Sequence, residues 1–184
     1  SPQARQMLRH PPRPRDAPVP WFLFAGDATA GLPALLSTAR TECVVPPADP
    51  SLGEPYWHWW LGRSVAAIAL HPGAVGEAAS TPHARALWLH GLLALAERRE
   101  RIPLHGVVVC MAASALRDAS GDTARPLATR MRRLLDEAGD TLRLQMPVYL
   151  VVTGLERLPG YAAVRGALPP EVLAQAKMLS CGWP

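Results

Sequence analysis

The sequence predicts an α/β domain in which a mainly parallel, doubly wound sheet carries helices on both faces. Four apolar runs of five or six residues have the length of buried strands, and they span residues 21–25, 65–70, 106–111 and 148–152. Helical segments separate them, which is typical of right-handed β-α-β units around a parallel sheet. A glycine-bounded loop lies between the first strand and the first helix, and this is the layout of a phosphate-binding loop.

The composition agrees with one globular domain and argues against several other classes. The chain has 184 residues, of which 49% are hydrophobic, so it can bury a substantial core. No apolar run reaches the roughly 18–20 residues that span a bilayer. The three cysteines lie far apart and predict neither a disulfide framework nor a zinc site. The net charge is +4, but the arginines lie among acids on predicted helices, so nucleic-acid binding is not indicated.

Residues 1–19 are predicted to form a basic linker rich in Pro and Arg, and the domain is predicted to span residues 20–184. The prolines exclude a regular helix or a central strand in the linker. It has no apolar segment of the kind found in secretory signals. Two interpretations stay open, a solvated tail or the cytoplasmic flank of a membrane helix, where Arg and Lys are in excess.

Residues 41–64 follow the first helix, which is expected over residues 32–40, and are mostly Pro, Gly and polar. A short edge strand is expected at Cys43–Val45, with the remainder a loop. That loop holds an aromatic cluster, which either packs across the sheet edge or forms an exposed patch that binds a partner. The expected split puts the pair Trp59-Trp60 in the core. The same split leaves Tyr56 or Trp57 more exposed, and these two residues are the candidates for a partner surface.

The second half of the chain alternates helices with the two remaining strands. Thr81 is the expected N-cap of a helix over residues 82–101, with Pro82 at its first position. Residues 114–118 are predicted to be a loop. An amphipathic helix is expected over residues 124–138, with shorter helices over residues 158–167 and 170–178.

The loop after the first strand keeps the spacing of a phosphate-binding loop but lacks its chemistry. Gly26 and Gly31 preserve the pattern Gly-x-x-x-x-Gly. Leu32 stands where a Lys would reach the phosphates, and Pro33 stands where Ser or Thr would hold Mg²⁺. Asp27 adds a negative charge to a loop that would bind a polyanion. The sequence therefore predicts a degenerate Walker A motif.

Two further strand ends lack the residues that nucleotide binding requires. A metal-organising Asp is expected after the second apolar strand, where this chain has Leu70 and His71. Proteins that bind guanine nucleotides carry Thr/Asn-Lys-x-Asp after the fourth strand, where this chain has Thr153, Gly154 and Glu156 around Leu155. We therefore expect a P-loop NTPase-like, small-GTPase-like fold with no catalytic residue, bound cofactor or metal, and we expect His71 to be structural.

In this order the segments resemble the cytoplasmic domain of the TssM/IcmF family, the inner-membrane core protein of bacterial type VI secretion systems. The matching segments are 20–23, 59–60, 65–73, 102–109, 146–149, 153–156 and 158–161. The resemblance implies flanking membrane helices outside this chain, a cytoplasmic location and possible homo-oligomers of the full-length protein. It also implies partners among the membrane-complex and baseplate proteins, with a TssL-like protein first.

The favoured hypothesis is a catalytically inactive pseudo-NTPase domain that acts as a protein–protein scaffold in that membrane complex. The alternative is a non-standard ATP- or GTP-binding NTPase, or a nucleotide sensor, that regulates assembly of the secretion complex. An unrelated small-molecule enzyme on the same fold is a third possibility. No Gly-x-Ser-x-Gly, His-Glu-x-x-His or Cys-x-x-Cys motif supports this third possibility.

Overall fold

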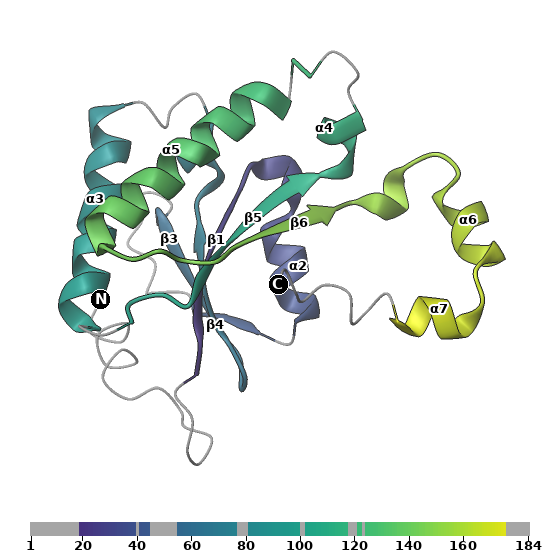
Figure 1. Ribbon diagram of the computed structural model, residues 1–184, viewed down its shortest axis with the longest axis horizontal. Coiled ribbons are helices and arrows are strands. Elements are labelled where there is room, and N and C mark those ends of the chain that lie inside the picture. The colour runs from purple at the N-terminus through teal and green to yellow at the C-terminus, as the bar shows by residue number, and fades with distance from the viewer. Residues whose placement is uncertain are drawn as a thin grey trace.

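The computed structural model describes residues 19–39, 41–44, 55–76, 81–99, 102–117, 121–122 and 124–175 (Figure 1). The predicted linker therefore lies outside the described residues, except for Val19.

The described residues form a six-stranded sheet in the order β2-β3-β4-β1-β5-β6. Strands β4, β1, β5 and β6 run parallel, while β2 and β3 pair antiparallel at one edge. The bounds are β1 Trp21–Gly26, β2 Glu42–Val44, β3 Trp57–Leu61, β4 Ala66–Leu70, β5 Gly106–Ala112 and β6 Val148–Thr153. The predicted fold class, a mainly parallel doubly wound sheet, is confirmed.

Helices cover both faces of the sheet (Figure 1). The helix α2 (Leu32–Thr38) packs on one face, and the long helices α3 (Pro82–Arg98) and α5 (Ala124–Leu142) pack on the other. The shorter elements are η1 Ala28–Ala30, η2 Pro72–Ala74, α4 Ala113–Arg117, η4 Leu155–Arg157, α6 Tyr161–Ala167 and α7 Pro170–Gln175. Thr81 caps α3 as expected, because its side chain accepts a hydrogen bond from the Ala84 N–H group.

Two apolar clusters hold the layers together. The larger contains Trp88 and Leu92 of α3, Met131 of α5 and the sheet residues that face them. The smaller contains Leu32 and Leu36 of α2, packed on the opposite face against β4 and β5. Every residue of β4 and β5 is buried, which explains why these strands are apolar without alternation.

Two local predictions are wrong. The aromatic segment forms β3, an antiparallel partner of β4, although we expected a loop there. The alternation explains it, because Trp57 and Trp59 pack into the larger cluster while Trp60 packs into the smaller one, as a strand of period two requires. Residues 113–117 form the short helix α4 directly after β5, where we expected a loop.

Candidate functional site

The predicted site residues lie at the carboxyl edge of the parallel strands, where α/β sheets bind ligands. The loops after β1 and β4 are neighbours because these strands pair directly. The loop after β6 is farther away, because β5 separates β6 from β1. The structure thus brings together two of the three predicted segments, and it places the third on the other side of β5.

The loop after β1 hydrogen-bonds to itself through Asp27. The carboxylate oxygen Oδ1 accepts from the Ala30 N–H at 3.0 Å and from the Thr29 hydroxyl at 2.6 Å. Asp27 thereby caps the short helix η1, and Gly31 then takes a left-handed conformation (φ 62°) before α2 begins. In a working phosphate-binding loop, such N–H groups point at the bound anion. Here a carboxylate of the chain itself accepts one of them.

The interior of this loop is filled by side chains. Ala30 is buried and belongs to the smaller apolar cluster. A Cβ atom added to Gly26 would lie 3.0 Å from the Ala30 Cβ atom and 3.0 Å from the Cys110 carbonyl oxygen. Gly26 is therefore needed so that the loop can pack closely against β5. This close packing contrasts with the open cradle that phosphates require.

Leu32 is the residue that most changes the chemistry of the loop. Its side chain is only 4% exposed and packs in the smaller cluster with Leu36 and Trp60. The phosphate-binding Lys of a working loop reaches toward the ligand instead. Pro33 lies exposed at the start of α2, where it offers neither a hydroxyl nor an N–H group. Both positions thus serve the packing and the start of this helix.

The end of β4 is apolar, and the turn that follows it is held by its own hydrogen bonds. Leu70 is 2% exposed and packs in the larger cluster, so this position offers no carboxylate to the loop after β1. His71 accepts a hydrogen bond from the Gly73 N–H group at its Nδ1 atom (3.1 Å), and its own N–H donates to the Tyr56 carbonyl oxygen. His71 therefore ties the turn after β4 to the start of β3.

The end of β6 also directs its polar groups away from a shared site. The Thr153 hydroxyl donates to the Met111 carbonyl oxygen at 3.4 Å. Gly154 is left-handed (φ 70°) and starts η4. The Glu156 carboxylate is exposed and lies 3.7 Å from the neighbouring Arg157 guanidinium. These residues build a turn, and the carboxylate that would read a base points to solvent.

The aromatic segment packs against α3. The Trp57 ring stacks on Trp88 with centroids 5.4 Å apart and an interplanar angle of 6°. Its indole N–H donates to the Leu87 carbonyl oxygen at 3.1 Å. Trp57 is able to lie there because Gly91 has no side chain, since a Cβ atom at this position would come within 2.1 Å of the ring.

The predicted split within this segment is right for Trp60, which lies in the core, and wrong for Trp59. Trp60 is buried, but Trp59 is half-buried, as are Tyr56 and Trp57. Trp59 contacts Trp21 edge-on, with ring centroids 5.4 Å apart. A partner-binding role for Tyr56 and Trp57 stays a prediction, and Trp57 would offer a partner only the part of its ring that α3 leaves uncovered.

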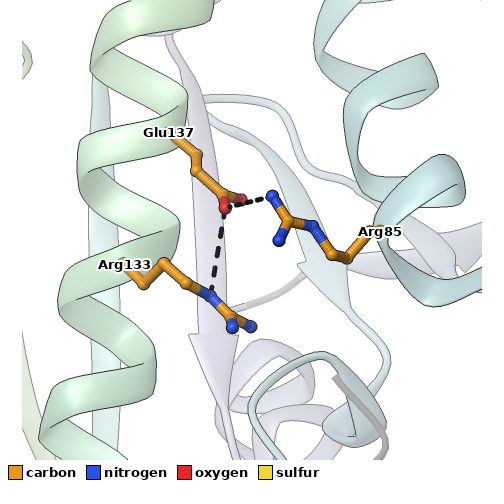
Figure 2. Close-up of polar contacts among 3 residues, drawn as sticks. All are labelled: Arg85, Arg133 and Glu137. Atoms are coloured by element: carbon orange, nitrogen blue, oxygen red, sulfur yellow. Dashed lines mark hydrogen bonds and ion pairs between the residues drawn. The ribbon is translucent and has the colours of Figure 1, made fainter. Parts of the chain in front are cut away.

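An ionic cluster that the sequence did not reveal joins α3 to α5 (Figure 2). Glu137 accepts from Arg85 at 3.1 Å, and Arg133 lies 3.9 Å from the same carboxylate oxygen. Burial raises the pKa of the nearby Tyr56 phenol to about 12, while the charge of Arg133 lowers it and that of Glu137 raises it. The Arg133 side chain lies between the two helices (Figure 2). An inter-helix partner such as Arg85 cannot be found from the spacing within one helix.

A second polar cluster lies at the opposite, amino end of the sheet. The unprotonated Nδ1 atom of His105 accepts from the Trp21 N–H group at 3.0 Å, and the His105 N–H donates to the Trp21 carbonyl oxygen. Burial, with the nearby charge of Arg99, lowers the pKa of His105. The Arg99 guanidinium lies 4.4 Å from the centroid of the Trp21 ring, and burial lowers its pKa. These contacts fix the start of β1 against β5.

The residues at the carboxyl edge do not fit a magnesium nucleotide. Leu32 supplies no cation for the phosphates, Pro33 supplies no hydroxyl for the metal, and the Asp27 carboxylate already accepts from the Ala30 N–H group. Within the described ranges, no three His, Cys, Asp or Glu side chains gather in a way that would hold a metal ion. In the same part of the chain, no helix combines the length and the apolar character that crossing a membrane requires.

The fold defines the class of this protein, an α/β domain with a mainly parallel, doubly wound sheet. A family model described as the IcmF-related N-terminal domain matches residues 82–178, more than half of the chain. The chain belongs to this family. The match begins at the helix α3, so it does not include the loop after β1 or the end of β4.

Solved structures with a similar arrangement are distant. The signal recognition particle receptor SRb-GTP/SRX complex from Chaetomium thermophilum is 16% identical over 87% of each chain, with a TM-score of 0.44. The ADP-ribosylation factor-like GTP-binding protein, a small COPII coat GTPase SAR1 from Encephalitozoon cuniculi in complex with GDP, is 15% identical. That comparison covers 83% of this chain and 85% of the other, with a TM-score of 0.29. A search of curated proteins gives no match to the chain.

Proposed function

We propose that this chain is a catalytically inactive, pseudo-NTPase domain that acts as a protein–protein scaffold in the membrane complex of a bacterial type VI secretion system. Membership of the IcmF-related family supports the secretion-system context. The proposed location is the cytoplasmic side of the inner membrane. The proposed partners are a TssL-like inner-membrane protein and components of the baseplate.

The observation that carries the proposal is the state of the loop after β1. Asp27 accepts a backbone N–H group that a phosphate would need, and the Leu32 side chain lies in the core. A nucleotide would have to displace the Asp27 hydrogen bonds and bring its negative charge close to this carboxylate. Two charges of the same sign about 4 Å apart repel by about 4 kcal/mol near a protein surface. A Lys side chain and a bound Mg²⁺ normally offset this charge. Here Leu32 stands in place of the Lys, and Pro33 offers no oxygen to hold Mg²⁺.

The scaffold role is supported by the position of the departures, because they change the residues for nucleotide chemistry and leave the fold intact. Gly26 and Gly31 keep the loop turn, and β1, β4 and β5 remain fully packed around it. A domain that keeps this framework without the chemistry retains surfaces for other proteins. The alternative, a nucleotide sensor, would require the loop to open and α2 to expose Leu32.

The test is a pull-down of a TssL-like inner-membrane protein by this domain, with and without Mg-ATP and Mg-GTP. We expect the same amount of bound partner in all conditions, because no nucleotide alters the domain. Asp27→Asn is the matched variant, since it keeps an acceptor oxygen for the Ala30 N–H group and removes the charge. It should bind the partner like the wild type. Capture that requires a nucleotide would refute the scaffold proposal and favour the sensor.

A further inference from the structure

The amino end of the sheet holds an arginine that lacks an anionic partner. Arg99 is the C-cap residue of α3, and its side chain is half-buried over the Trp21 ring. The Nη1 atom is buried and finds no hydrogen-bond acceptor in the part of the chain that the structure describes. The same part of the chain gives Arg99 no ion pair. Buried charged donors are normally paired, because leaving them without an acceptor is unfavourable.

The residues around Arg99 do not supply the missing acceptor. The contact with Trp21, at 4.4 Å from Cζ to the ring centroid, stabilises the positive charge but leaves the Nη1 N–H groups unpaired. The nearest described acid along α3 is Glu97, which is exposed. It lies two residues away and therefore on a different side of the helix. The acceptor is thus expected to come from another molecule.

His105 supplies a second donor beside the same tryptophan. Its Nδ1 atom accepts from the Trp21 N–H group at 3.0 Å, so the neutral imidazole carries its proton on Nε2. This Nε2–H group makes no hydrogen bond to any described residue. Burial lowers the pKa of His105 and the charge of Arg99 lowers it further, so the guanidinium lies near the imidazole. Two kinds of unpaired N–H donor therefore lie around Trp21.

The charge of this pair favours a carboxylate over a phosphate. Hydrogen bonds between a guanidinium and a carboxylate are short and strong, and the second carboxylate oxygen can accept from the imidazole. Neutral His105 adds no charge, so the single positive charge of Arg99 balances one carboxylate. A phosphate group carries a charge of about −1.5 to −2 at neutral pH. The carboxyl end of α3, which has a partial negative charge, disfavours that larger charge further.

We propose that Arg99 and His105 form a binding site for a carboxylate group, supplied by an acidic side chain of a partner protein or by a small free carboxylate. Arg99 makes the main contact, His105 donates a second hydrogen bond, and Trp21 holds both residues in place. The inference goes beyond the scaffold proposal. It concerns the end of the sheet opposite the loop after β1, so it does not depend on whether the domain binds nucleotide.

The test follows the side-chain NMR signals of His105 while sodium acetate is added at constant ionic strength, up to about 100 mM to cover millimolar affinities. The wild type should show a saturable change. His105 should also titrate at a higher pH in acetate, because a nearby negative charge favours the imidazolium. Arg99→Gln should raise the Kd for acetate about tenfold or more. Arg98→Gln is the matched control, since it removes the same charge from an exposed neighbouring position and should leave the Kd within about twofold.

Two further arms keep the result specific. Arg99→Lys keeps the charge and loses the planar fork, so it should also weaken acetate binding, and it serves if Arg99→Gln does not fold in thermal unfolding. A short peptide with one Glu, compared with its Gln twin, separates the two sources. Binding of the Glu peptide assigns an acidic side chain, and binding of acetate alone assigns a small carboxylate.

Three results would overturn the proposal. The first is the absence of a saturable change in the His105 signals with acetate. The second is an acetate Kd that Arg99→Gln and Arg99→Lys leave unchanged, or that Arg98→Gln raises as much as they do. The third is inorganic phosphate that binds more tightly than acetate, because the site would then not select a single negative charge.

Discussion

Gly91→Ala is a substitution whose effect this structure predicts to be opposite in sign to the usual one. Replacing a glycine inside a helix by alanine normally stabilises the helix by about 1 kcal/mol. Gly91 lies inside α3, but a Cβ atom there would come within 2.1 Å of the Trp57 ring. The ring would have to leave its place between Gly91 and Trp88.

The magnitude follows from the contacts that Trp57 would lose. The stack on Trp88 contributes about 1 kcal/mol, and the hydrogen bond to the Leu87 carbonyl oxygen contributes about as much. Repacking an overfilled site costs a further 1–3 kcal/mol or so. After subtraction of the helix gain, Gly91→Ala should destabilise the domain by about 2–4 kcal/mol.

Urea unfolding followed by circular dichroism measures this free energy of unfolding. Gly166→Ala in α6 is the control, because a Cβ atom there meets nothing within 4 Å, and it should be neutral or stabilising. In a Trp57→Ala background the obstacle is gone, so Gly91→Ala should then stabilise by up to about 1 kcal/mol. The reasoning is refuted if Gly91→Ala stabilises the otherwise unchanged domain.

Two further predictions concern the loop and the amino end of the sheet. The double substitution Leu32→Lys and Pro33→Thr should not restore hydrolysis, and turnover in a phosphate-release assay would contradict this. The same variant should lower the free energy of unfolding by several kcal/mol, because it buries a charge in the smaller cluster. The pKa of His105 is lowered in the folded state, so the unfolded chain binds the proton first as the pH falls. The contribution of His105 to the free energy of unfolding is therefore complete above about pH 6.5 and is lost as the pH falls toward the folded-state pKa. His105→Asn keeps an acceptor for the Trp21 N–H group, so its unfolding free energy should fall less between about pH 7 and 5, and an equal fall would count against this role.

The strands and their faces were predictable because each depends on short-range pattern. The runs at β4 and β5 are apolar throughout, and Thr81-Pro82 marks the start of α3 by chemistry that acts within one turn. The strand β3 was harder to predict, because its alternating aromatic residues follow a segment rich in Pro and Gly. The Pro and Gly residues led to the prediction of a loop over the whole segment.

The state of the candidate site was predictable only in its chemistry. The sequence identified Leu32 and Asp27 as departures from a working loop. It gave no means of knowing that Leu32 packs in the core or that Asp27 accepts the Ala30 N–H group. Both facts depend on how closely the loop packs against β5, and such a contact between segments far apart in the sequence belongs to the tertiary structure. The pairing of Arg85 with Glu137 is of the same kind, since it joins residues 52 positions apart.

A thermal-shift titration with Mg-ATP and Mg-GTP tests the central claim, that the loop after β1 does not bind nucleotide. A site with a Kd of about 10 µM would stabilise the domain by about 2.7 kcal/mol at one hundred times that concentration. For a domain of this size such a gain raises the unfolding midpoint by about 5–10 °C. We predict that the midpoint stays where Mg²⁺ alone leaves it. A saturable rise of several degrees with either nucleotide would contradict the account.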